Sequence, residues 1–267
     1  MPMVHVADLE VHYVEAGDPA GTPVLFVHGN WGTASWWEPL LARLGPGHRG
    51  LAYDVRGRGR TTGPDNSYAI DALAADLLAF ATAIHADRFH LVGHSLGTAI
   101  AMQAALDAPE RVRSLAAIAP AWVDGMPAAY NVPAGQIAIK NDPALFATAL
   151  KPLAPTVADD DFWKRLVREG HGQRIEAALR NLDALVAWRP GDRLTAIPAP
   201  KLVIAGTLDP LTGGANADRA AAALGARLVT LDGVGHSPNI EAPDRVATLL
   251  AELWAASDTP ELTDQSL

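Results

Sequence analysis

Apolar and polar positions along the chain follow two alternating periods. Short apolar runs of the kind that form buried strands are followed by segments with apolar residues at helical spacing. Pro23 to His28 (PVLFVH) is the clearest strand, and Ile70 to Ile84 is the clearest amphipathic helix, with Asp71 and Asp76 on its outer face. This rhythm is typical of βαβ units, so the sequence predicts an α/β fold with a mostly parallel central sheet flanked by helices.

The other predicted elements continue this rhythm from the N-terminus to residue 256. The other strands are expected at Met3 to Val6, Glu10 to Glu15, Arg49 to Tyr53, Phe89 to Val92, Val112 to Ile118, Lys201 to Ala205 and Arg227 to Leu231. The other helices are expected at Ser35 to Leu44, in the alanine-rich stretch up to Ala108, and at Ala215 to Leu224 and Pro243 to Ala256. The polar residues from Ser257 onward are expected to form a frayed tail.

The stretch from Pro120 to Pro200 breaks the rhythm. It contains irregular, proline-interrupted segments that favour helix, such as Asp160 to Glu169 and Gln173 to Trp188. A chain of 267 residues with 49% hydrophobic content is long enough for one large core. We therefore expect a core domain formed by residues 1–119 and 201–267, with residues 120–200 inserted as a cap, or lid, over the sheet.

The charge balance excludes some classes of partner. Thirty acidic and twenty-one basic residues give a formal net charge of −9. A chain this acidic has no electrostatic reason to bind nucleic acid or an anionic membrane. The sequence has no basic N-terminal stretch followed by an apolar run, and no apolar window long enough to span a bilayer. We expect a cytoplasmic protein that is a monomer or a homodimer.

Cysteine is absent, which excludes disulfides, thiolate metal sites and a cysteine nucleophile. No H-x-x-x-H pattern and no acidic cluster has the character of a metal site. The sequence therefore predicts neither a metal nor another cofactor.

Gly93-His94-Ser95-Leu96-Gly97 has the G-x-S-x-G pattern of a nucleophile elbow. It stands between a predicted strand and a predicted helix, where a serine at a tight turn is presented at the edge of the sheet. Both glycines are expected to be required sterically, because a Cβ at either position would collide with a neighbouring strand or helix. The pattern predicts Ser95 as a nucleophile.

An oxyanion beside Ser95 needs backbone donors. The amide of Leu96 begins the following helix, where the helix dipole also favours negative charge. The loop after the strand that ends at His28 is expected to supply a second donor, the amide of Asn30, with Trp31 as the second choice.

A serine hydroxyl needs a neighbouring base, for which histidine is best suited near neutral pH. Among nine histidines, His236 in Val-Gly-His-Ser-Pro follows the last predicted strand and so lies at the same end of the sheet as Ser95. His94 is adjacent to Ser95, but its side chain is expected to point away around the turn. His28 ends a buried strand and is expected to be structural.

The imidazole in turn needs a carboxylate to orient it. Asp209 in Gly-Thr-Leu-Asp leaves the preceding predicted strand, and Asp124 is the reserve. The chain order Ser95, Asp209, His236 matches the order that accompanies a G-x-S-x-G elbow.

Five stretches together carry a family resemblance: FVHGNWG, YDVRGRGR, LVGHSLG, VIAGTLDP and GVGHSPNIEAP. In this order they resemble the α/β-hydrolase fold family over almost the whole chain. The resemblance implies that residues 120–200 form a variable cap that shapes the substrate pocket. It also places the chain outside the family members that remove halides or open epoxides with an aspartate nucleophile, because residue 95 is serine.

Two further groups of side chains invite a functional interpretation. Trp31 and Trp122 follow strand ends near Ser95 and are expected to line an apolar substrate pocket. Asp54, Arg56, Arg58 and Arg60 are expected to form ion pairs that fix a loop, since the chain lacks the Lys-Ser/Thr of a phosphate-binding loop.

The predicted activity is hydrolysis of a carboxylic ester or lactone of a small to medium apolar substrate, by an acyl-enzyme of the carboxylesterase or lactonase type. The same triad also serves C–C bond hydrolysis, amide or peptide cleavage, hydroxynitrile cleavage and acyl transfer to another acceptor. A non-catalytic ligand sensor on the same fold is the alternative from another class, because fold does not dictate function.

Overall fold

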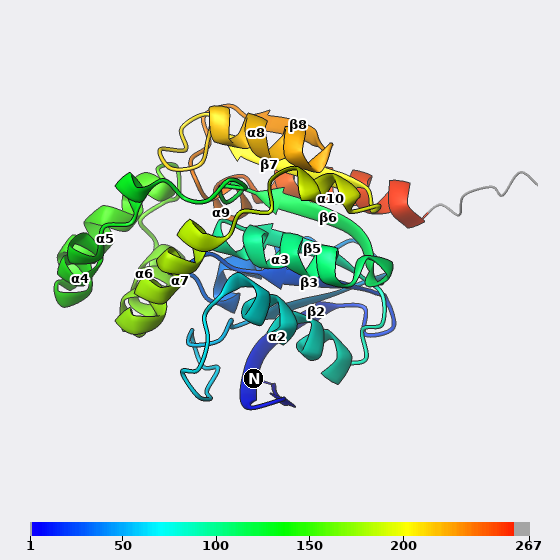
Figure 1. Cartoon of the computed structure of the whole chain (residues 1–267), viewed down its shortest axis with the longest axis horizontal. Helices are drawn as coiled ribbons and strands as arrows, with labels where there is room; N and C mark the ends of the chain where they lie inside the picture. Colours follow the sequence, from blue (N-terminus) through cyan, green and yellow to red (C-terminus); the bar gives the residue numbers. More distant parts are fainter. Residues whose placement is uncertain (1, 259–267) are drawn as a thin grey trace, which may run out of the picture.

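An eight-stranded sheet forms the centre of the computed structural model, which describes residues 2–258 (Figure 1). Its strands lie in the order β1-β2-β4-β3-β5-β6-β7-β8. Their bounds are β1 Met3–Val6, β2 Leu9–Gly17, β3 Thr22–Val27, β4 His48–Tyr53, β5 Phe89–His94, β6 Val112–Ile118, β7 Lys201–Gly206 and β8 Arg227–Leu231. Only the pairings β1–β2 and β2–β4 are antiparallel among these strands. The predicted fold class, with a mostly parallel sheet, is confirmed.

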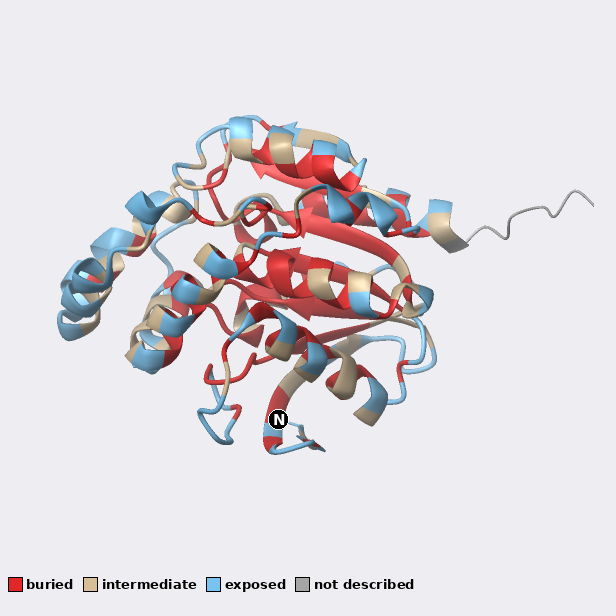
Figure 2. Cartoon of the chain, viewed as in Figure 1, coloured by how far each residue is buried: buried red, intermediate tan, exposed pale blue. Residues whose placement is uncertain are grey.

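Helices cover both faces of the sheet. Their bounds are α1 Glu38–Leu41, α2 Ile70–Ala83, α3 Leu96–Asp107, α4 Pro133–Asn141, α5 Pro143–Leu150, α6 Asp161–Gly172, α7 Ile175–Ala187, α8 Ala215–Leu224, α9 Pro238–Glu241 and α10 Pro243–Asp258. Helices α2, α3 and α8 contribute to the core on one face, and α1 and α10 to the core on the other. Because both faces are covered, the central strands are almost continuously apolar, and Figure 2 shows them buried.

The prediction of one continuous helix from Ser35 to Leu44 is wrong. The chain makes a 3-10 helix over Ala34–Trp37 and then the single turn of α1. Proline has no N–H and a fixed φ, so Pro39 favours the start of a new helix over the continuation of the old one.

The sequence pattern did not predict α4 and α5 as separate helices. It marked this stretch only as proline-interrupted. Each helix begins at one of those prolines, Pro133 or Pro143. Asp142 caps α5, because its side chain accepts hydrogen bonds from the amides of Ala144 and Leu145. The prolines therefore mark helix starts. Of the expected frayed tail, Ser257 belongs to α10, and residues 259–267 lie outside the described residues.

Helices α4 to α7 gather beyond one end of the sheet (Figure 1). Phe146 of α5 and Trp163 of α6 share an apolar cluster with Trp36 from the loop after β3. Polar contacts join the same parts: the hydroxyl of Thr33 donates to Glu169 at 2.7 Å, and the side-chain amide of Gln173 donates to backbone carbonyls of the loop after β3. Apolar packing and hydrogen bonds thus hold these helices over the loop that follows β3.

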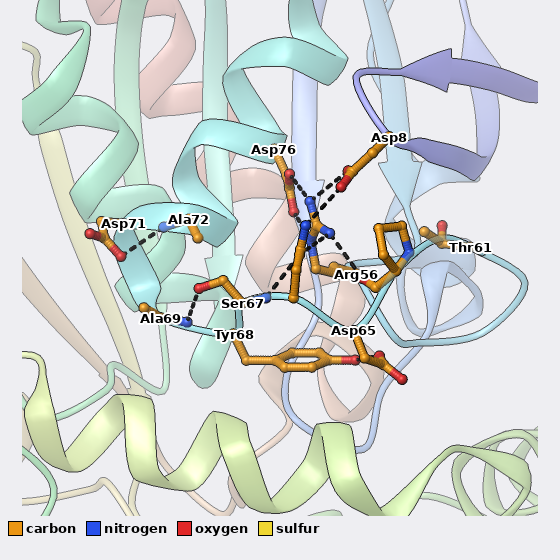
Figure 3. Close-up of polar contacts among 12 residues, drawn as sticks. Asp8, Arg56, Thr61, Asp65, Ser67, Tyr68, Ala69, Asp71, Ala72 and Asp76 are labelled. Atoms are coloured by element: carbon orange, nitrogen blue, oxygen red, sulfur yellow. Dashed lines mark hydrogen bonds and ion pairs between the residues drawn. The ribbon is translucent and has the colours of Figure 1, made fainter.

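Arg56 anchors the loop after β4 (Figure 3). Its guanidinium donates to Asp76 at 2.7 Å and to Asp8 at 3.0 Å, and both carboxylates raise its pKa above the usual range. Asp54, in the same run, contacts His12 at 2.7 Å. A loop-fixing ion pair is therefore correct for Arg56, and Asp54 makes a buried polar contact with His12. Arg58 differs, since no carboxylate among residues 2–258 forms an ion pair with it.

None of the helices within residues 2–258 combines the length and the apolar character that crossing a bilayer requires.

Candidate active site

Ser95 occupies the sharp turn between β5 and α3. Its backbone has φ 52° and ψ −120°, an uncommon conformation for a residue other than glycine, and its amide donates to the carbonyl of Ile118 at 3.0 Å. A Cβ at Gly97 would lie 2.0 Å from the carbonyl oxygen of Val27, and one at Gly93 would lie 2.5 Å from the oxygen of Gly97. The two glycines therefore allow β5, α3 and β3 to approach closely around a strained serine.

His236 and Asp209 come together from the ends of neighbouring strands. Asp209 follows β7 and His236 follows β8, and Nδ1 of the histidine lies 3.0 Å from Oδ2 of the carboxylate. The two side chains are 4% and 0% exposed. Because the strands are parallel, the loops that follow them meet at one edge of the sheet, as do Ser95 and the loop after β3.

The Asp209 carboxylate is fixed and ionised. Its Oδ1 atom accepts hydrogen bonds from the amides of Leu211 at 2.8 Å and Thr212 at 3.0 Å. Burial would raise its pKa, but the hydrogen bond and charge of His236 and the two amides outweigh burial and lower the pKa to about 2. The carboxylate is therefore charged at neutral pH and aimed at the imidazole.

Thr212 is a further contact that the sequence reasoning missed. Its hydroxyl donates to Oδ2 of Asp209 at 2.9 Å and lies 3.3 Å from Nδ1 of His236. An aspartate side chain often accepts hydrogen bonds from the amides two and three residues later, which makes a common turn. Thr212 stands three residues after Asp209, so this turn was the signal available in the sequence.

The expectation that His94 points away from the site is wrong. Its Nε2 atom lies 2.8 Å from the carbonyl oxygen of His236, and the two rings are 5.1 Å apart. Burial, together with the neighbouring His236, lowers the pKa of His94 to about 3, so the ring is neutral and its Nε2–H donates to the carbonyl. His94 thus holds the backbone of His236 and also lines the cavity described below.

His28 has the structural role expected of it. Its Nε2 atom accepts the amide of Val55 at 3.1 Å, so Nδ1 carries the proton and donates to the carbonyl of Gly29 at 2.8 Å. Burial lowers its pKa to about 4, which keeps the ring neutral.

The two residues expected to supply oxyanion donors, Leu96 and Asn30, follow Ser95 and Gly29 in the chain. Leu96 is the first residue of α3, and Gly29 lies so close that an added Cβ would be 3.2 Å from the Cβ of Ser95. The side chain of Asn30 donates to the carbonyl of Ala178 at 3.3 Å, which ties the loop after β3 to α7.

A cavity of about 270 Å³ brings the predicted residues together. Ser95, His236, Asn30, Trp31 and Trp122 all lie on its wall. Helices α4, α5 and α7 complete the wall with mostly apolar side chains, and no Asp, Glu, Lys or Arg is among its lining residues. The other lining residues include Trp36, Met126, Tyr130, Gln136, Ile139, Phe146, Leu150, Leu182 and Leu185.

The reserve acid does not reach this cavity. Asp124 is exposed and pairs with Arg219 at 2.7 Å. Within residues 2–258, no group of three His, Asp or Glu side chains is arranged to hold a metal ion.

Comparison with known proteins places the chain in a family. Residues 24–249 match the Alpha/beta hydrolase family. The chain belongs to this family. A protein of Variovorax paradoxus (strain S110) classed as a carbamate hydrolase, RutD, is 35% identical over 219 residues, which are 76% of this chain and 80% of that protein.

Two other relatives extend the comparison. The rhodomycin D methylesterase DnrP of Streptomyces peucetius is 29% identical over 258 residues, covering 83% of this chain and 87% of its own. The solved structure of Est816, described as an N-acyl homoserine lactone degrading enzyme, has a TM-score of 0.79 at 28% identity and covers 94% of this chain and 99% of that one. The predicted family and enzyme class, an α/β-hydrolase of the esterase and lactonase type, are confirmed.

Proposed function

We propose that the protein is a serine hydrolase that cleaves carboxylic ester or lactone bonds of small to medium apolar substrates. Ser95 is the nucleophile, His236 the general base and Asp209 the carboxylate that orients it. The observation that carries this proposal is the buried His236–Asp209 pair, whose histidine shares the wall of an apolar cavity with a serine in a strained turn.

Acylation begins when the Ser95 hydroxyl attacks the substrate carbonyl and gives its proton to Nε2 of His236. Asp209 accepts the hydrogen bond from Nδ1 and stabilises the imidazolium that forms. The carbonyl oxygen becomes an oxyanion, which accepts hydrogen bonds from the amides of Leu96 and Asn30. Each such donor contributes about 10²–10³-fold to turnover in enzymes of this type.

Collapse of the tetrahedral intermediate breaks the bond to the leaving alcohol, which takes the proton from His236. Water then attacks the acyl-enzyme and gives a proton to the same histidine. The second intermediate releases the acid and returns the proton to Ser95. In a lactone the alcohol and the acid belong to one molecule, so one product is released.

The cavity and the relatives support this substrate class. A mostly apolar wall around about 270 Å³ fits small to medium apolar acyl and alcohol groups. Two of the similar proteins are described as a methylesterase and a lactone-degrading enzyme. We further propose that residues 120–200, which include α4 to α7, act as the cap that shapes this cavity over a core of residues 1–119 and 201–267.

The likeness to a carbamate hydrolase favours a second candidate. Ser95 would attack the carbonyl of a carbamate and give its proton to His236, which would then protonate the departing amine or alcohol. Comparing ester and carbamate substrates with the same alcohol separates the two candidates.

Pre-steady-state hydrolysis of p-nitrophenyl butyrate tests the proposal. The wild type should release p-nitrophenol in turnover, with a burst if deacylation is slower than acylation. Ser95→Ala and His236→Ala should each lose several orders of magnitude in turnover while keeping the circular dichroism spectrum. Ser67→Ala, at a half-buried loop serine that does not line the cavity, is the matched control and should behave as the wild type. A folded wild-type protein with neither burst nor turnover would instead indicate a ligand sensor.

A further inference from the structure

Arg58 is a buried cation whose hydrogen bonds are incomplete. The residue is 1% exposed. Its Nη2 atom donates to the side-chain oxygen of Asn30, whereas Nε and Nη1 have no partner among residues 2–258. A buried guanidinium normally has all its donors satisfied, because an unpaired buried charged group is expensive. Arg58 therefore carries a buried positive charge that a negatively charged group nearby would stabilise.

Among residues 2–258, no carboxylate compensates the charge of Arg58. Burial, and to a smaller extent the nearby Arg174, lower its pKa to about 9, while the neighbouring Tyr68 raises it. The guanidinium is thus still protonated at neutral pH. No carboxylate of the described residues pairs with it, although Arg56, two positions earlier, has two such partners.

Two cavity-lining residues separate this charge from the cavity. Asn30 accepts the hydrogen bond from Arg58, and the guanidinium carbon lies 5.8 Å from the centre of the Trp31 ring. Asn30 is held firmly, because it also accepts from Asn181 at 3.3 Å and donates to Ala178 at 3.3 Å. Arg58 therefore contacts a residue of the cavity wall whose position is fixed.

The electrostatics of the cavity are set by charges behind its wall, since no ionised carboxylate, ammonium or guanidinium lines it. Asp209 stands behind His236, and its charge is engaged by the imidazole and two amides. Arg58 contacts Asn30, another residue of the wall, and has no carboxylate partner among residues 2–258. In a medium of low polarity such a charge acts across several ångströms, so the wall at Asn30 is positive.

We propose that the part of the cavity wall formed by Asn30 and Trp31 is a subsite for a carboxylate carried by the substrate, with Arg58 as its countercharge across Asn30. The inference rests on the proposed function and narrows it to ester, lactone or related substrates that bear one free acid group. The protein as a whole carries a charge of −9, which repels anions at a distance. A preference for an anionic substrate therefore has to come from a local cation.

Equilibrium binding to Ser95→Ala tests the subsite without requiring turnover. The probes are monoethyl succinate and its neutral isostere ethyl succinamate, which have the same ester bond, and calorimetry measures both dissociation constants. We expect the anion to bind about tenfold or more tightly, the size of a single local charge interaction. Equal binding of the two probes would overturn the subsite.

Variants of Arg58 in the same background assign the preference to its charge. Combined with Ser95→Ala, Arg58→Gln and Arg58→Met should each lose the preference for the anion, and Arg58→Lys should retain most of it. Arg227→Met is the matched control, because it removes one positive charge from an exposed ion pair on β8 and should leave the preference unchanged. A preference that persists in folded Arg58→Gln would refute the role of Arg58.

Turnover separates this inference from the proposed function. With Ser95 intact, the ratio of kcat/KM for the two probes should fall in Arg58→Gln and recover in Arg58→Lys. Any effect of Arg58 on the oxyanion is common to both probes and cancels in that ratio. Hydrolysis of p-nitrophenyl butyrate without a preference for the anion would sink the subsite alone. Preferential binding of the anion with no hydrolysis of any ester would sink the proposed function alone.

Discussion

Oδ2 of Asp209 lies 3.0 Å from Nδ1 of His236, and both side chains are almost fully buried. The two residues belong to loops after β7 and β8, neighbouring parallel strands in the sheet. Two backbone amides and the hydroxyl of Thr212 also hold the carboxylate. This pair fixes the histidine in the tautomer whose Nε2 atom is free to accept a proton.

Asp209→Asn should lower kcat by about 10³–10⁴-fold, the loss typical of removing the charge behind a catalytic histidine. The amide no longer stabilises the imidazolium, and its NH₂ group favours the wrong tautomer of His236. Steady-state kinetics on p-nitrophenyl butyrate measure the change. Asp124→Asn is the control, since that carboxylate pairs with Arg219 on the surface, and its kcat should stay near the wild-type value. A larger loss in Asp124→Asn than in Asp209→Asn would reverse the assignment of the acid.

Gly97→Ala should destabilise the fold. The added methyl group would lie 2.0 Å from the carbonyl oxygen of Val27, in backbone that has little room to move. Overpacking of this kind lowers the free energy of unfolding by about 1–3 kcal/mol. A clash with the backbone lies at the upper end of that range or beyond it. Urea unfolding measures the change. Gly172→Ala is the matched control: it is the last residue of α6, has no atom within 4 Å of the added Cβ, and should unfold like the wild type or slightly later. Equal midpoints would contradict the role given to Gly97.

The free energy of unfolding should fall as the pH is lowered from 7.5 to 5. His28 and His94 have folded-state pKa values lowered to about 4 and about 3 by burial, below the usual 6.5. In this window the unfolded chain binds protons that the folded chain excludes, so stability is lost as the pH falls below about 6.5. The expected loss at pH 5 is on the order of 2 kcal/mol for each histidine.

His94→Gln isolates one of these contributions. Glutamine keeps an amide donor for the carbonyl of His236 but does not titrate, so the variant should lose less stability between pH 7.5 and 5 than the wild type. Asp209 does not interfere, because its lowered pKa affects stability only as the pH falls below about 4 toward its folded value of about 2. Urea unfolding at the two pH values gives the comparison, and an identical loss in both proteins would contradict a buried neutral His94.

The sequence was most informative where local pattern and strand order carry the structure. The apolar run before His28, the G-x-S-x-G turn at Ser95 and the positions of Asp209 and His236 after strands suffice to place these groups at one sheet edge. They suffice because parallel strands present their following loops at the same edge. The mostly parallel sheet follows from the same alternation.

What the sequence could not predict depends on contacts between distant segments. Nothing local to Gly93-His94-Ser95 indicates that the His94 ring bonds to the backbone of His236, because that contact crosses 142 positions. Arg58 resembles its neighbour Arg56 in sequence, yet only Arg56 faces carboxylates, since Asp8 and Asp76 come from elements on its side of the loop. Side-chain direction after a glycine-rich turn is set by tertiary packing, and residue type alone does not reveal it.

Covalent labelling tests the central claim, that Ser95 is an activated nucleophile, most directly. A fluorophosphonate probe reacts with a serine hydroxyl that has a neighbouring base and an oxyanion site. After digestion, mass spectrometry of the wild type should find one phosphonylated site, at Ser95, and the label should disappear in Ser95→Ala and fall strongly in His236→Ala. Labelling of Ser95→Ala at the wild-type rate, or a folded wild type that takes up no label, would contradict the account.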